Sequence, residues 1–251
     1  MSMKDTIKNL RRWFLYGYRH STKSFIRKMN SLGANIDETV GMAVPESVFI
    51  DKQAPFLVEI GAHTGFAEGV KILTHDASWL AMKAQDGVIR GHMGPVKIGR
   101  HVFVGMNSII MAGVTVCDYA IIGANSVVSS SITKPGIYAG NPAKLVIGMD
   151  EFRAIRDSRQ VKEAYNVARA YYERYGQKPP KEIFSEYFWV FEKREIEGLP
   201  VEYIRQMEYG GTFDMAKDAF LNSEPDFEGY DAFWDWCMEK IEKEKQRKQK
   251  A

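Results

Sequence analysis

His75 stands beside Asp76 in the stretch KILTHDASW, residues 71–79, and this pair is the strongest candidate for acid–base chemistry in the chain. A carboxylate that bonds one imidazole nitrogen fixes the tautomer and makes the other nitrogen a better base. At the wall of a groove, such a base can take a proton from an alcohol that attacks a thioester. The pair therefore predicts His75 as a general base, oriented by Asp76.

Two other histidines, His63 and His101, share with His75 the fourth place of a six-residue repeat. That place lies near a corner of the repeat and faces outward, so for His63 and His101 we favour simple solvated surface residues. His75 differs because an acidic residue follows it and because the repeat breaks down at this point. The break itself is therefore part of the argument for a site.

The repeat that must position these residues runs from Ile98 as IGRHVF, VGMNSI, IMAGVT, VCDYAI, IGANSV and VSSSIT. A period of six fits neither a helix, with its period near 3.6, nor a plain strand, with its period of 2. It fits a triangular coil in which each short strand turns a corner, with glycine or another tolerant residue relieving the corner. The predicted fold is a mainly β, left-handed parallel β-helix. The first residue of each hexad is aliphatic and should point inward: Ile98, Val104, Ile110, Val116, Ile122 and Val128.

Three hexads make one coil, so Ile98 should stack on Val116, Val104 on Ile122, and Ile110 on Val128. The same register occurs earlier at Ile60, Phe66 and Ile72, and then fails. An excursion loop over residues 76–95 must therefore leave the coil, and such long loops are often functional. We place the β-helix domain at residues 30–148, with Leu32, Val44, Val48 and Ile50 as interior residues of an irregular opening coil.

Both ends of the chain have helical patterns. Residues 1–29 predict a basic amphipathic helix that caps the open end of the coil or, alternatively, contacts an anionic membrane surface. Residues 149–251 predict an α-helical region whose aromatic run, Tyr187 to Phe191, serves helix packing or an intersubunit contact, with sugar stacking as a less favoured alternative.

Composition narrows the classes of function. The net charge of +2 gives no general attraction to nucleic acid, so no nucleic-acid partner is expected. Cys117 and Cys237 stand too far apart for a disulfide framework or a metal-ligand motif, which suits a reducing cytoplasm. The first residues carry scattered charges where a signal peptide would be apolar. We therefore expect a cytoplasmic protein that is able to contact the inner membrane face.

The motifs ILTHD, FVGMNSII, AGVTV, IGANSVV and AGNPAK resemble the hexapeptide-repeat acetyltransferases, specifically the sugar and polysaccharide O-acetyltransferases. The resemblance covers roughly residues 30–148. It implies a homotrimer in which acetyl-CoA lies in a groove between neighbouring β-helices and a histidine serves as general base for direct transfer. It also implies a sugar or glycan acceptor, and His75 occupies the position of the family's histidine.

The resemblance carries over further residues. The amide of Met106 corresponds to the donor that binds the thioester carbonyl, so Met106 joins His75 and Asp76 in the catalytic set. Acetyl-CoA contacts are implied for Phe103, Ala124, Asn141, Pro142 and Lys144. The excursion loop is expected to shape the acceptor pocket with Trp79, Lys83, Asp86, Arg90 and His92. The chain departs from the family in VVSSSITK, where Ser130 replaces the usual lysine.

Two other functions compete with acetyl transfer. A zinc hydratase similar to the γ-class carbonic anhydrases would need three converging histidines, for which His75, His92 and His101 are the nominees. Their spacing is wrong, and the hydratase would leave AGNPAK without a role, so no metal is expected. A non-catalytic trimeric scaffold is the second alternative, and the histidine beside the broken repeat argues against it.

Overall fold

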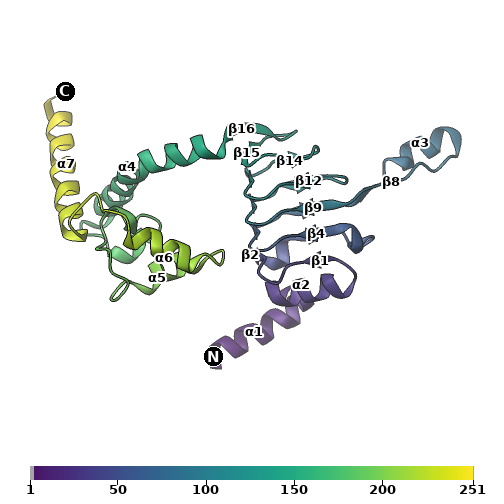
Figure 1. Cartoon of the computed structure of the whole chain (residues 1–251), viewed down its shortest axis with the longest axis horizontal. Coiled ribbons are helices and arrows are strands. Elements are labelled where there is room, and N and C mark those ends of the chain that lie inside the picture. Colours follow the sequence, from purple (N-terminus) through teal and green to yellow (C-terminus); the bar gives the residue numbers. More distant parts are fainter. Residues whose placement is uncertain (1–2, 251) are drawn as a thin grey trace. The chain divides into compact units, whose positions relative to one another are not determined.

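The computed structural model describes residues 3–250, and the chain divides into two compact units between Phe152 and Arg153. The first unit is a coil of short parallel strands with helices at its start, and the second consists of helices (Figure 1). None of the helices within residues 3–250 has the length and apolar character needed to cross a membrane.

Within residues 3–250, the strands of the coil form three mainly parallel sheets. The β9 sheet contains β1 (Asn35–Ile36), β4 (Val58–Ile60), β9 (Val96–Ile98) and β12 (Thr115–Val116). The β10 sheet contains β2 (Gly41–Met42), β5 (Gly65–Phe66), β10 (Phe103–Val104), β13 (Ile121–Ile122), β15 (Gly136–Ala139) and β16 (Lys144–Gly148), of which β16 is antiparallel to β15. The β11 sheet contains β3 (Phe49–Ile50), β6 (Lys71–Ile72), β11 (Ile109–Ile110) and β14 (Val127–Val128).

The register of these sheets confirms the stacking predicted from the repeat. Each inward aliphatic residue lies over its equivalent in the next coil, and burying such a side chain contributes about 1.5–3 kcal/mol. The six-residue repeat thus predicts correctly which inward side chains stack on one another in the core. The confirmed pairs are Ile98 with Val116, Val104 with Ile122, and Ile110 with Val128, and the preceding coil pairs Ile60, Phe66 and Ile72 with Ile98, Val104 and Ile110.

The corners confirm the prediction that glycine or another tolerant residue relieves them, and they use two places of the hexad. At the second place of the hexad, glycine is needed because the next coil passes close by: a Cβ on Gly105 would lie 2.6 Å from the amide nitrogen of Ala124. The turn itself is made at the fourth place, by Gly69 and Gly113 with φ values of 76° and 79° and elsewhere by non-glycine residues with left-handed φ values of 53° to 61°. The non-glycine residues at this place are His63, His101, Asn107, Tyr119 and Asn125.

The opening coil departs from the predicted interior. Val48 and Ile50 are buried as predicted, but Leu32 is exposed at the end of a helix and Val44 is only partly buried. Ile36 and Met42 point inward instead. The count of six fails here because two 3₁₀ turns, η2 (Pro45–Ser47) and η3 (Pro55–Leu57), lengthen two sides of the coil.

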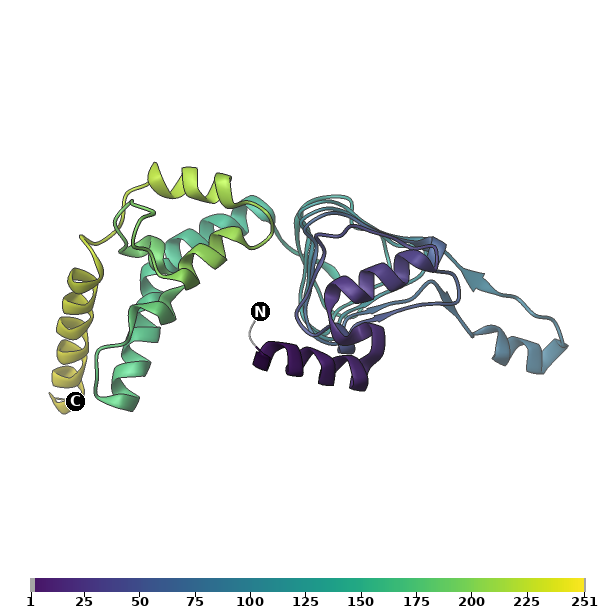
Figure 2. The same ribbon diagram turned by 90° about the horizontal axis from the view of Figure 1, so that it is seen from below.

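The predicted N-terminal helix is two helices, α1 (Met3–Tyr16) and α2 (Thr22–Ser31), separated by η1 (Gly17–His20). The chain turns at Ser21, which is extended and whose side chain caps α2 by accepting a hydrogen bond from the Ser24 amide. Phe25, Ile26 and Met29 of α2 are buried in the core of the coil. Figure 2 shows the triangular outline of the coil with α2 lying across its end.

The excursion predicted as a loop has structure of its own. It begins with β7 (His75–Asp76), which pairs antiparallel with β8 (His92–Met93), and the helix α3 (Trp79–Asp86) lies between them. This ribbon and helix project from the side of the coil (Figure 1). We call residues 75–93 the arm.

The second unit contains α4 (Met149–Tyr175) from Arg153 onward, η4 (Lys181–Phe184), η5 (Phe188–Val190), α5 (Val201–Glu208), α6 (Phe213–Leu221) and α7 (Tyr230–Lys250). The aromatic run is mostly core: Phe188 stacks on Tyr203 with ring centroids 4.5 Å apart, and Phe191 packs on Phe184 and Phe233. Buried in this way, Phe188 and Phe191 offer no platform for sugar stacking, so the prediction of helix packing is confirmed for them.

Candidate active site

His75 is held by a carboxylate that lies 24 residues earlier in the chain. Its Nδ1 is hydrogen-bonded to Oδ2 of Asp51, the residue that follows β3. The imidazole side chain is 30% exposed, whereas the Asp51 side chain is only 6% exposed. The histidine ring therefore reaches solvent while its partner stays inside the coil.

Asp51 is itself fixed by several donors. Its Oδ2 accepts hydrogen bonds from the Thr74 hydroxyl at 2.6 Å and the Thr74 amide at 3.2 Å, and its Oδ1 accepts one from the Gln53 amide at 2.9 Å. Burial alone would raise the pKa of Asp51, but these bonds and the one from His75 outweigh it and lower the pKa. Asp51 is thus an ionised, buried anchor for the histidine.

Asp76 does not take the role that its place in the sequence suggested. Its Oδ2 bonds Nδ1 of His92 at 2.7 Å, and its Oδ1 accepts the Ser78 amide at 2.8 Å. The prediction that Asp76 orients His75 is wrong because consecutive side chains on a strand point to opposite faces. In the β7–β8 ribbon His75 lies opposite Met93, and Asp76 lies opposite His92.

The arrangement at His75 suits proton transfer. With Nδ1 bonded to a carboxylate, Nε2 is the nitrogen that can accept a proton, and the ionised Asp51 stabilises the imidazolium that forms.

The rest of the arm is more exposed: the Lys83 ammonium lies 5.9 Å from the centre of the Trp79 ring, and Arg90 pairs with Asp86 at 2.7 Å. The arm that carries His75 thus also carries the residues predicted to shape the acceptor pocket: Trp79, Lys83, Arg90 and His92.

A second group of predicted residues gathers where the β10 sheet turns into the β11 sheet. Phe103 is exposed on β10 beside Ile121, and Met106 and Ala124 occupy the same turn position in successive coils. Within the described part of the chain, neither the Met106 amide nor the Ala124 amide donates a hydrogen bond to the protein. Both amides are thus available to a ligand.

The AGNPAK segment lies against the same corner. The Gly140 amide donates to the Ser126 hydroxyl at 3.1 Å, and the Ala143 amide donates to the Val127 carbonyl at 2.8 Å. Asn141, Pro142 and Lys144, the last in β16, are all exposed. We call the surface formed by Phe103, Met106, Ala124, Asn141, Pro142 and Lys144 the amide corner.

The structure does not bring the arm and the amide corner together within one chain. His75 follows β6 of the β11 sheet, at the corner where the coil turns toward β9. Met106 follows β10 of the β10 sheet, at the preceding corner. A triangular coil keeps its corners apart, so a site that uses both His75 and Met106 needs two copies of the chain.

Comparisons with known proteins agree with this architecture. Residues 95–130 match the family model described as bacterial transferase hexapeptide (six repeats). The chain is 32% identical over 127 residues to protein CapG of Staphylococcus aureus, covering 50% of this chain and 72% of that relative. The chain belongs to the bacterial hexapeptide-repeat transferase family.

Two further likenesses concern parts of the transferase. It is 49% identical over 53 residues to a probable macrolide acetyltransferase of Lysinibacillus sphaericus, a match that spans 21% of this chain and 29% of that protein. A solved maltose O-acetyltransferase from Clostridium difficile 630 aligns at 19% identity and a TM-score of 0.40, covering 59% of this chain and 89% of that one. The transferase is an enzyme of the acyl-CoA-dependent acetyltransferase class to which its relatives belong.

The zinc set nominated from the sequence is not assembled in the transferase. His75 and His92 bond different carboxylates on opposite faces of the ribbon. His101 lies at the third corner, where its ring stacks on His63 at 5.0 Å and on Tyr119 at 5.3 Å. Across residues 3–250, no group of three or more His, Cys, Asp or Glu side chains is arranged to hold a metal ion.

Sequence reasoning missed Asp51, which bonds His75, and Thr74, which bonds Asp51. Asp51 follows an inward aliphatic residue, Ile50, and lies one coil below Leu73. An acidic residue directly after a buried strand and close to the histidine's corner was the available signal. The turn at η3 hid it, because the spacing from Ile50 to Ile72 is 22 residues and not 18.

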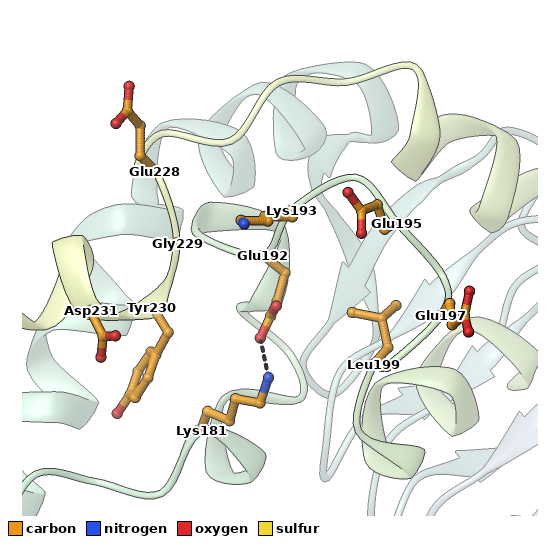
Figure 3. A pocket seen from close by; sticks show the side chains of 11 residues that line it. Lys181, Glu192, Lys193, Glu195, Glu197, Leu199, Glu228, Gly229, Tyr230 and Asp231 are labelled. Atoms are coloured by element: carbon orange, nitrogen blue, oxygen red, sulfur yellow. Dashed lines mark hydrogen bonds and ion pairs between the residues drawn. The ribbon is translucent and has the colours of Figure 1, made fainter.

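A hollow of about 570 Å³ in the second unit contains none of the predicted site residues (Figure 3). Lys181 pairs with Glu192 at 3.2 Å inside it, and the carboxylates of Glu195, Glu197 and Glu228 stand exposed around it. Exposed acidic groups of this kind are ordinarily solvated, so the hollow is not part of the candidate active site.

Proposed function

We propose that the transferase moves an acetyl group from acetyl-CoA to a hydroxyl of a sugar or surface-polysaccharide precursor. The observation that carries this proposal is the His75 imidazole, anchored at Nδ1 by buried Asp51 and open to solvent at the base of the arm. Transfer is direct, with no acyl-enzyme. The reaction takes place in the cytoplasm, where acetyl-CoA is supplied.

The chemistry follows from this base. Nε2 of His75 takes the proton of the acceptor hydroxyl as its oxygen attacks the thioester carbonyl carbon. The oxyanion that forms is stabilised by an amide of the amide corner, that of Met106. The tetrahedral intermediate then collapses, the carbon–sulfur bond breaks, and the His75 imidazolium returns its proton to the thiolate of CoA.

A homotrimer of left-handed coils supplies both halves of the site in this proposal. The outward residues of the β9 sheet are polar, with Lys97 paired to Glu59 at 3.3 Å. The outward residues of the other two sheets are largely apolar: Phe103, Ile121 and Ile137 on the β10 sheet, and Phe49, Ile109 and Val127 on the β11 sheet. These apolar faces flank the amide corner, so the arm of a neighbouring copy is expected there.

Mixing two inactive variants tests the shared site. His75→Asn removes the base from one chain, and Ala124→Trp blocks the amide corner of another. In a mixed oligomer, His75 of the second chain faces the intact amide corner of the first, so part of the activity should return. If each variant is inactive alone and the mixture stays inactive although mixed oligomers form, the site is not shared between copies.

Release of free CoA thiol, measured against a panel of sugars, nucleotide sugars and a macrolide, tests the acceptor class. The panel includes the macrolide because the matched Lysinibacillus relative is named a macrolide acetyltransferase. Isothermal titration with CoA separates the enzyme from the alternative of a scaffold, which should not bind it. Binding of CoA with transfer only to the macrolide would refute the sugar acceptor and leave acetyl transfer standing.

A further inference from the structure

The first helix presents an unpartnered apolar stripe. On α1, Leu10, Trp13 and Phe14 share one face at the spacing of i, i+3 and i+4. Phe14 is 84% exposed, Leu10 68% and Trp13 57%. Leu15 and Tyr16 at the end of the same helix are exposed as well. A group of exposed, large apolar side chains of this kind is typical of a surface that binds a protein, a membrane or a ligand.

The opposite face of α1 is fastened to the coil. Arg12, about half a turn from the stripe, donates to Oε2 of Glu46 at 2.7 Å and to the His20 carbonyl at 3.1 Å. The next helix, α2, is anchored by buried Phe25 and Met29. These contacts hold the stripe outward, so it is a presented surface and not a misplaced part of the core.

The stripe lies in the most basic part of the chain. Between residues 3 and 28 the sequence has eight Lys and Arg residues and one Asp, whereas the whole chain has a net charge of only +2. On α2, Lys23 and Arg27 are exposed around a hollow of about 290 Å³ that Asn30 and the exposed Glu38 also line, so two cations stand there against one carboxylate. Cations beside exposed Trp and Phe side chains are the combination that an anionic lipid surface attracts.

We propose that α1 and α2 dock the transferase on the surface of an anionic phospholipid bilayer. The stripe of Leu10, Trp13 and Phe14 enters the boundary between head groups and acyl chains, and the basic residues neutralise lipid phosphates. A second copy of the chain fits this surface less well, because two such N-terminal segments would bring like charges together. The proposal is independent of the reaction that His75 catalyses.

Sedimentation of the full-length protein with vesicles tests the docking. Binding is expected to vesicles of equal parts phosphatidylglycerol and phosphatidylcholine in low salt, and to fall at least tenfold on pure phosphatidylcholine or in 0.5 M salt. Phe14→Glu should weaken binding to the anionic vesicles by at least tenfold. Met215→Glu, on α6 at a residue that is 73% exposed, is the matched control and should bind as the parent does.

Two outcomes would overturn the proposal. One is an absence of sedimentation with anionic vesicles in low salt, or binding that Phe14→Glu and Met215→Glu lower equally. The other is a fall in the oligomeric mass of Phe14→Glu, measured by light scattering without vesicles, which would assign the stripe to a second copy. Circular dichroism confirms that both variants remain folded.

Discussion

Two histidines on opposite faces of the arm's short ribbon each bond an aspartate, and the two pairs differ in what surrounds the carboxylate. Asp51, the partner of His75, is buried and held by Thr74 and Gln53. The side chain of Asp76, the partner of His92, is 37% exposed, and among the described residues it is hydrogen-bonded to Ser78 and His92. The same two residue types thus make a rigid pair in one place and a solvated pair in the other.

The pair of His75 and Asp51 is the one suited to catalysis. A base must keep one tautomer and one orientation, and buried hydrogen bonds enforce both. A pair on the surface exchanges its partners with water and contributes little. Hydrogen bonds with Ser78 and His92 lower the pKa of Asp76 to about 2, so this carboxylate stays ionised without being anchored.

Replacing the proposed base should have the largest effect. We expect His75→Asn to lower kcat by about 10² to 10⁴, because general bases contribute that much. His63→Asn is the matched control, since Asn107 and Asn125 already occupy the same left-handed corner position in other turns. Steady-state rates with the oligomer intact provide the measurement, and equal losses in both variants would remove His75 from the mechanism.

Changing Asp51 and Asp76 separately to Asn tests directly which of the two carboxylates serves the reaction. Asp51→Asn should lower kcat on the order of 10- to 100-fold, because the imidazolium loses its buried counter-ion. Asp76→Asn should change kcat by less than about threefold, since the His92 pair is exposed. A larger loss for Asp76→Asn than for Asp51→Asn would show that the pairing in the sequence, and not the pairing in the structure, serves the reaction.

The threonines allow structure and catalysis to be separated. Thr74 and Thr64 are both fully buried, and each hydroxyl donates one hydrogen bond, to Asp51 in the first case and to the Gly99 carbonyl in the second. Either change to Val should cost about 1–3 kcal/mol of unfolding free energy. Only Thr74→Val should also lower kcat, by several-fold, and urea unfolding together with kinetics tells the two effects apart.

The contrast between the coil and the arm explains what sequence reasoning could reach. The inward residues Ile98 to Val128 repeat at every sixth position because each must bury itself over its equivalent, so the sequence reports the fold directly. In the ribbon of the arm β7 is half-buried and β8 is exposed, and α3 buries no side chain, so the sequence has no apolar period that predicts either element. Asp51 was missed for a different reason, because the lengthened first coil shifted it out of register with His75.

The smallest expected effect is on stability in acid. Because the folded state lowers the pKa of Asp51, the unfolded chain binds this proton more readily, and stability is lost as pH falls through the lowered pKa. The contribution is complete above the unfolded pKa of about 3.9 for Asp. Urea unfolding at successive pH values should therefore show the parent approaching Asp51→Asn in stability as the solution becomes acidic. A constant difference between them down to low pH would mean that Asp51 is not held as an ionised carboxylate, and the contrast with Asp76 would lose its physical basis.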